Sequence, residues 1–263
     1  MLVKTKIKQA FSSAAQSYDE VAALQRQVGR ELWRKLGVVA ADAILLDLGC
    51  GTGFMLSELI NRQQTLPEFS MAMDIAEPML HIARERLMPQ QDMGYLCGDM
   101  EQLPFENESI NIIISNLALQ WCQNTEAMFS EIHRTLKPGG HFGFTTFGSR
   151  TLQELKQAWQ AVDAYQHVND FYQAQQINDF LNRTNFTIES VEVETHQINY
   201  QSVVDLMAEL KQLGAHTVIR GNNPRITGKA AMQRMKTAYE QQMDSGLITA
   251  TFEVITVVAK RVV

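Results

Sequence analysis

The segment from Ile44 to Asp74 limits the fold of this chain more than any other part of it. Apolar residues at 44–48 lead into the run GCGTG at 49–53, and an amphipathic stretch follows. Glycine allows a sharp backbone turn that a Cβ would obstruct. The pattern therefore predicts a strand, a tight turn and a helix, followed by a second strand that ends at Asp74.

The same alternation continues along the chain. A helix predicted at 125–136 should end at the Lys-Pro-Gly-Gly segment 137–140, because proline cannot continue a helix and glycine tolerates the left-handed conformation that ends one. Short apolar strands that alternate with helices predict a parallel sheet covered on both faces. The other predicted elements are strands at 69–74, 93–99, 110–116 and 141–147 and a helix at 77–87.

This pattern divides the chain into four parts. Residues 1–38 have apolar positions at helical spacing and predict an N-terminal helical cap, and residues 39–148 form the binding core. Residues 149–246 predict a helical lid and substrate region with an added strand near 187–199. Residues 247–263 predict a strand that returns to the core sheet.

Composition narrows the class of function. The formal net charge is −6, so nucleic acid is not an expected partner. No apolar stretch approaches the roughly 20 residues of a membrane span, and the N-terminus lacks the apolar run of a secretory signal. Cys50, Cys97 and Cys122 are widely spaced without a CxxC pair. They predict reduced thiols, no metal site and a cytoplasmic protein.

Three alternating glycines where a strand meets a helix predict a ligand-binding turn, because the unpaired amides of the helix N-terminus face it. A plain turn at this place needs only one glycine. A dinucleotide-binding turn would place its third glycine at Phe54, whereas Gly53 stands one position earlier. The spacing favours a nucleoside joined to an amino acid over a pyrophosphate.

Polar residues also end the strands that follow. Asp74 could cap the next helix, but its register with the glycine turn favours hydrogen bonds to both ribose hydroxyls of a nucleoside. Asp99 is placed to accept from an adenine amino group, with Met100 packing on the ring. Asn116 and Leu117 end the strand beside the point where the strand order reverses, which is where such sheets bind ligands.

Four segments in this order, DLGCGTG, MDIAEPML, CGDMEQLPF and LKPGG, resemble the class I S-adenosylmethionine-dependent methyltransferases over residues 40–147. The resemblance implies an α/β fold: a doubly wound, mostly parallel seven-stranded sheet with an antiparallel last strand, a helical cap and an inserted helical lid. It implies S-adenosylmethionine as cofactor, S-adenosylhomocysteine as product, and no metal. The residues expected to contact the cofactor are Asp47, Gly49, Cys50, Gly51, Gly53, Asp74, Ile75, Met79, Asp99, Met100, Asn116, Leu117 and Gln25.

Segments outside that core resemble a narrower family, the biotin-pathway enzymes that O-methylate the malonyl thioester of acyl carrier protein. The implied activity converts the free malonyl carboxylate into its methyl ester. A carboxylate with a pKa near ~4 is already ionised at neutral pH, so no catalytic base is expected. The segments are 11–36, SNLALQW at 115–121, TFGSRTLQELKQAW at 146–159, LKQLGAH at 210–216 and NPRITGK at 223–229.

An anionic substrate needs a partner in the site, because a buried unpaired charge is costly, and the arginine fork suits a carboxylate. Arg225 in NPRITGK and Arg150 after the fifth strand are the candidates, although either could be a solvated surface residue. The resemblance adds Tyr18, whose hydroxyl would reach the cofactor or the substrate. His167 and His216 lie in the variable region and are weaker candidates for the substrate channel.

The expected partner is an acyl carrier protein bearing a malonyl thioester, with malonyl-coenzyme A as an alternative. Carrier proteins are acidic, so this acidic chain needs local positive charge to bind one. The alternative activities are methylation of another small acid, such as an aconitate, and of a quinone precursor. Candidate docking residues are Lys4, Lys6 and Lys8 near the N-terminus and Arg220, Arg225, Lys229, Arg234 and Lys236 in the lid region.

Overall fold

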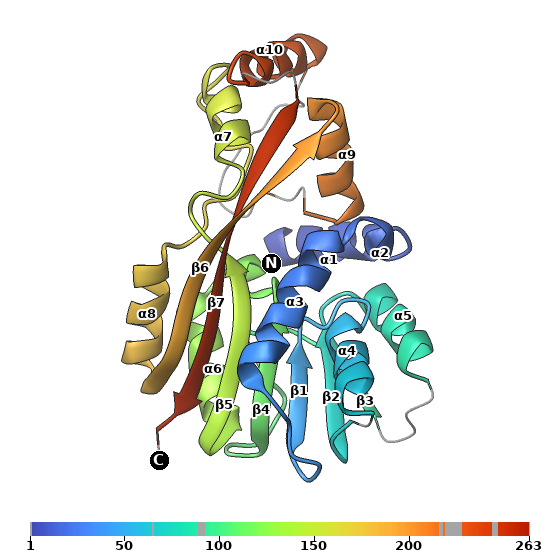
Figure 1. The fold of residues 1–263 in the computed structure, drawn as a ribbon, viewed down its shortest axis with the longest axis vertical. Coiled ribbons are helices and arrows are strands. Elements are labelled where there is room, and N and C mark those ends of the chain that lie inside the picture. The colour runs from blue at the N-terminus through green and yellow to red at the C-terminus, as the bar shows by residue number, and fades with distance from the viewer. Residues whose placement is uncertain are drawn as a thin grey trace.

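The computed structural model describes residues 2–64, 66–88, 93–215, 218, 228–243 and 247–262. Within these residues, seven strands form one sheet in the order β3-β2-β1-β4-β5-β7-β6 (Figure 1). The strands are β1 (Ile44–Leu48), β2 (Phe69–Asp74), β3 (Met93–Cys97), β4 (Ile110–Asn116), β5 (Leu136–Phe147), β6 (Phe186–Tyr200) and β7 (Ile248–Arg261).

The first five strands pair in parallel, and β7 runs antiparallel between β5 and β6. The predicted mixed sheet with an antiparallel last strand is confirmed. Parallel pairing brings the carboxyl ends of β1, β2 and β4 to one edge. The strand order reverses between β1 and β4, and ligands of such sheets bind outside that edge.

Helices cover both faces of the parallel part, as strands buried on both sides require. Adjacent residues of β1 point to opposite faces: Leu45 packs with Leu32 and Leu56, whereas Leu46 belongs to the cluster around Phe129. The first face carries α3 (Ala23–Leu36), α4 (Phe54–Gln63) and α5 (Glu77–Leu87), and the second carries α6 (Thr125–Thr135) and α8 (Ala174–Arg183).

The helix α6 ends one residue before its predicted end. The helix ends at Thr135, and the segment Lys137–Gly140 already belongs to β5. Leu136 is extended, with φ −67° and ψ 141°, and it pairs with Ile110. Leu136 is fully buried in the core, so strand pairing ends the helix before proline can act. The pairing is irregular between Ile110 and Ile112.

A second apolar core surrounds the far ends of β6 and β7, which extend beyond the parallel strands (Figure 1). Trp159, Leu206, Tyr239 and Phe252 pack together there. Within the predicted helical lid at 149–246, residues 161–173 are not helical. The helices around this core are α7 (Gln153–Gln160), α9 (Val203–Gln212) and α10 (Lys229–Glu240).

The N-terminal helices lie over the carboxyl edge of the sheet (Figure 1). They are α1 (Leu2–Ala14) and α2 (Tyr18–Val21), and α3 follows directly. Asp19 joins this cap to the core: its carboxylate accepts a hydrogen bond from Thr52 Oγ1 at 2.8 Å and pairs with Arg86 of α5. Among the described helices, none has the length and apolar character to cross a bilayer.

Candidate functional site

The glycine turn after β1 needs its glycines for conformation and for space. Gly49, Gly51 and Gly53 all have positive φ, at 75°, 53° and 81°. A Cβ on Gly49 would lie 2.4 Å from Cβ of Ala118, whereas a Cβ on Gly51 would meet nothing within 4 Å. The turn is therefore packed against the protein on one side and faces open space at Gly51.

Asp74 ends β2 beside this turn. Its carboxylate accepts hydrogen bonds from the amides of Gly51 at 2.9 Å and Ala76 at 2.8 Å. Burial raises the pKa of Asp74, although these amide bonds pull it down. The N-cap of α5 is Ala76, which makes no side-chain cap, so Asp74 is not the N-cap residue. Asp74 instead ties the glycine turn to β2 and lines a cavity.

Asp47 is a buried carboxyl group near the end of β1. It is 0% exposed, and both of its carboxylate oxygens lack a hydrogen-bond partner in the described part of the chain. Burial and the nearby charge of Asp74 raise the pKa of Asp47 to about 8. Buried polar atoms almost always have partners. An unsatisfied carboxylate below a ligand-binding turn therefore suits a cationic ligand group.

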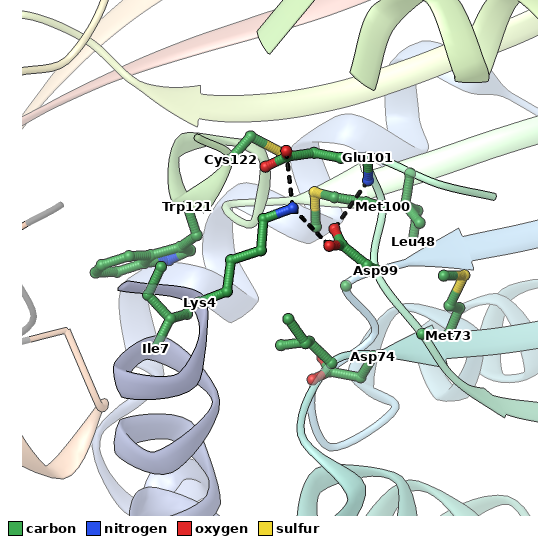
Figure 2. A pocket seen from close by; sticks show the side chains of 13 residues that line it. Lys4, Ile7, Leu48, Met73, Asp74, Asp99, Met100, Glu101, Trp121 and Cys122 are labelled. Carbon is green, nitrogen blue, oxygen red and sulfur yellow. Dashed lines mark hydrogen bonds and ion pairs between the residues drawn. The ribbon is translucent and has the colours of Figure 1, made fainter. Parts of the chain in front are cut away.

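A cavity at the ends of β1, β2 and β3 is lined by Asp99, Met100 and Ile75, three of the residues expected to contact the cofactor. Figure 2 shows Lys4 of α1 reaching into it. Its Nζ lies 2.5 Å from Asp99 Oδ2 and 2.8 Å from Glu101 Oε2. Burial lowers the pKa of Lys4, but hydrogen bonds to Asp99 and Glu101 outweigh this and raise it.

Lys4 is therefore not the docking residue that the sequence suggested. It shares a helix face with Ile7, and both line the cavity. Sequence reasoning also missed Glu101, which follows the Gly-Asp-Met ending of β3 directly. The sequence signal that could have revealed it is the spacing of Asp99 and Glu101, which stand two residues apart just after β3, where one cation can bind both.

Other expected cofactor residues hold this edge together. Asn116 Nδ2 donates to the backbone carbonyl of Gln25 at 2.9 Å, and Asn116 Oδ1 accepts from Thr145 Oγ1 at 2.8 Å. Leu117 has a positive φ of 49° at the end of β4. Cys50 is buried in the glycine turn, and burial raises the pKa of its thiol.

Met79 and Tyr18 lie together in a small apolar cluster under α1 and α2. Met79 is fully buried there and does not line the described cavities. Tyr18 is half-buried. Burial, followed by the charge of Asp74, raises the pKa of Tyr18, so its hydroxyl stays protonated. The hydroxyl is close enough to Asp74 to sense its charge, which places Tyr18 on the Asp74 side of the site.

A second cavity of about 200 Å³ lies between α3, α7, α9 and β7. Trp121 of the short helix η1 (Leu119–Trp121) lines both cavities. Gln25 and His167 are polar members of an otherwise largely apolar wall. His167 stacks on Trp159 at 3.7 Å, and its Nε2 lies 2.9 Å from Asp163 Oδ1.

Of the two predicted arginines, only Arg150 lies among the described residues, and it does not line either cavity. Arg150 is exposed, and its amide donates to Glu253 Oε2 at 3.3 Å. Arg225 lies outside the described residues, as do Arg220 and His216. The remaining docking candidates lie on helix surfaces: Lys6, Lys8, Lys229 and Arg234 are exposed and Lys236 is half-buried. Among the described residues, no group of three or more His, Cys, Asp or Glu could hold a metal ion.

Comparison with known proteins extends this description. A family model described as "Methyltransferase domain" matches residues 46–144. The fold is similar to the YcgJ protein of Bacillus subtilis, with a TM-score of 0.65 at 14% identity, over 89% of this chain and 98% of that one.

Two relatives match over most of this chain. The chain is 40% identical over 249 residues to the biotin biosynthesis bifunctional protein BioHC of Teredinibacter turnerae. This match covers 92% of the chain but only 44% of the BioHC protein. The chain is also 40% identical over 256 residues to malonyl-[acyl-carrier protein] O-methyltransferase of Methylococcus capsulatus, covering 96% of this chain and 92% of the relative. The chain belongs to the family of malonyl-[acyl-carrier protein] O-methyltransferases.

Proposed function

We propose that this chain transfers a methyl group from S-adenosylmethionine to the free carboxylate of a malonyl thioester held by an acyl carrier protein. The observation that carries the proposal is the pair of cavities that meet at Trp121. One is lined by the strand ends of a nucleoside-binding sheet edge and the other by apolar side chains. The names of the relatives supply the substrate class.

The described residues fit this cofactor. A cationic ammonium group on its methionine end would satisfy Asp47, whose two oxygens have no partner among the described residues. Asp74 is placed for the ribose hydroxyls and Asp99 for the adenine amine. Met100 offers an apolar surface for the ring. These assignments use three carboxylates at three neighbouring positions, as one extended ligand with several donors requires.

The proposed reaction requires the protein to bind and orient the two reactants, and it requires no catalytic base. The bound cofactor supplies a methyl group on a sulfonium, which is an activated donor. A carboxylate with a pKa near ~4 is ionised at neutral pH and needs no base. The protein must hold the attacking oxygen and the methyl group in line and keep water away. Phe11 of α1 packs edge-on against Trp121 at 5.2 Å, so the cap closes the junction of the two cavities.

Catalysis on a carrier protein also requires a docking surface. Exposed cations on two helices, Lys6 and Lys8 on α1 and Lys229 and Arg234 on α10, are the candidates among the described residues. Contacts between such exposed charges are screened by salt. The Michaelis constant for the carrier-bound substrate should therefore rise with ionic strength.

Mass spectrometry of the carrier protein tests the main proposal. Purified enzyme, S-adenosylmethionine and malonyl-carrier protein should yield a carrier heavier by one methyl group. Methylation of free aconitate without any gain on the carrier would overturn the proposal in favour of the small-acid alternative.

Charge reversal tests the docking surface separately. Glu at all four positions, Lys6, Lys8, Lys229 and Arg234, should raise the Michaelis constant at least tenfold, while the affinity for S-adenosylhomocysteine stays within about twofold. Arg62→Glu is the control, because Arg62 is an exposed cation in the last turn of α4 and is not one of the docking candidates. Unchanged turnover in the fourfold variant would place the docking surface elsewhere.

A further inference from the structure

Gln25 occupies the first turn of α3, at the edge of the sheet where the two cavities meet. Its backbone carbonyl accepts the hydrogen bond from Asn116 Nδ2 at 2.9 Å, and Thr145 holds Asn116 in turn. Ala118, two residues beyond Asn116, packs against the glycine turn. The position of Gln25 is thus fixed relative to the cofactor-binding edge.

The side chain of Gln25 lines the cavity of about 200 Å³ together with Trp121. Of the described side chains in this wall, Gln25 has a buried polar atom, Oε1, without a hydrogen-bond partner. Two other polar side chains of the wall, those of Thr151 and His167, are engaged with protein. The hydroxyl of Thr151 donates to the carbonyl of Glu253 at 3.0 Å and accepts from its amide at 3.1 Å. His167 is held by Asp163 at 2.9 Å.

The unpaired buried oxygen Oε1 of Gln25 costs free energy unless a ligand satisfies the carboxamide in one of its two orientations. A carboxylate is made of acceptors, and a carboxamide can turn half a turn about its last bond to present its NH₂ group. A neutral donor has a further advantage here. A hydrogen bond to one carboxylate oxygen orients the other oxygen, and it withdraws less electron density from the attacking atom than an ion pair does.

We infer that the side-chain amide of Gln25 binds the substrate carboxylate, donating to the oxygen that is not methylated. Gln25 is then a substrate residue rather than the cofactor residue expected from the sequence. This inference rests on the proposed function, because it takes the malonyl carboxylate as the ligand. A neutral carboxamide, that of Gln25, then recognises the malonyl carboxylate near the junction of the cavities.

Direct binding measurements test the inference. With S-adenosylhomocysteine bound, malonyl-carrier protein cannot be methylated, so its dissociation constant can be measured at equilibrium. Gln25→Leu should weaken this binding about tenfold, since a hydrogen bond to a charged group is lost. Gln25→Glu should weaken it further, because it places like charges together. Acetyl-carrier protein, which has no free carboxylate, should bind both variants within twofold of the wild type.

Two controls separate this role from others. Gln27 is exposed on the same helix, and Gln27→Glu makes the same change of charge without facing the cavity. It should leave malonyl-carrier binding within twofold. The affinity of the Gln25 variants for S-adenosylhomocysteine alone should also stay within twofold.

The outcomes are distinguishable. A parallel loss of S-adenosylhomocysteine affinity would make Gln25 a cofactor residue and overturn the inference. Equal weakening of malonyl- and acetyl-carrier binding, or none, would also overturn it. If the wild-type enzyme does not methylate malonyl-carrier protein, the proposed function and this inference fail together. If it does, and the Gln25 variants bind normally, only the inference fails.

Discussion

Replacing Asp47 by Asn should stabilise the ligand-free protein and at the same time weaken its hold on the cofactor. Asp47 is 0% exposed, and neither carboxylate oxygen has a partner among the described residues. Asparagine has nearly the same shape but carries no charge. The substitution therefore removes a buried ionisable group that the free protein does not satisfy, and that a cationic ligand would need.

The direction and size of the stability change follow from the pKa of Asp47, which is about 8 in the folded protein against an ordinary value of 3.8. Between these values the folded protein holds the proton more tightly than the unfolded chain does. Its stability therefore falls as pH rises through this window, and the loss is absent below about pH 4. At about 1.4 kcal/mol for each pH unit, the loss is about 4 kcal/mol at pH 7. Asp47→Asn should recover most of it.

Urea unfolding followed by circular dichroism measures this between about pH 5 and 8. The difference in the free energy of unfolding between variant and wild type should grow with pH at about 1.4 kcal/mol for each pH unit. Asp42→Asn is the control, because Asp42 is exposed just before β1 and the same substitution should leave the pH slope unchanged.

Calorimetry with S-adenosylhomocysteine tests the predicted effect of Asp47 on ligand binding. Its ammonium group should favour the ionised form of Asp47, so the wild type should release up to one proton on binding at pH 7. The Asn variant should release none from this position and bind at least about tenfold more weakly. A variant that gains less than about 1 kcal/mol at pH 7, or whose pH slope matches the wild type, would refute the argument from burial.

Three further substitutions follow from the same edge of the sheet. Gly49→Ala should cost about 3 kcal/mol or more of folding free energy in thermal or urea unfolding, because φ is 75° and the new Cβ would lie 2.4 Å from that of Ala118. Gly51→Ala meets nothing within 4 Å, so unfolding should change by only about 1 kcal/mol while S-adenosylhomocysteine affinity falls at least tenfold. Equal stability losses for both would contradict the packing argument. Lys4→Met frees Asp99, so S-adenosylhomocysteine should bind about threefold more tightly by calorimetry, and amide hydrogen exchange in α1 should be faster. Unchanged affinity and exchange would show that this ion pair does not compete with the ligand.

Several errors of the sequence predictions share one cause. Lys4 appeared as one of three solvated lysines, because helical periodicity cannot say which neighbour a helix face will meet. Asp19, which joins the cap to α5 through Arg86, carried no recognisable signal, since the partners are 67 residues apart. The early end of α6 likewise came from the pairing of Leu136 with Ile110, a contact across the sheet.

The sequence itself placed the residues proposed to bind the cofactor at one edge of the sheet. Asp47 lies near the end of β1, Asp74 ends β2, the glycine turn follows β1 and Asp99 follows β3. Parallel pairing brings the ends of such strands to one edge whatever the rest of the chain does. The local pattern therefore carried the information.

The cavity proposed to bind the substrate was revealed only by the tertiary structure. Its wall combines Gln25 of α3, Trp121 of η1, and apolar residues from α7, α9, α10 and β7, which lie far apart in the chain. Apolar residues that line a cavity have the same spacing in sequence as apolar residues that fill a core. Only the packing of these elements distinguishes the two, and only packing reveals that Oε1 of Gln25 has no hydrogen-bond partner in the described part of the chain.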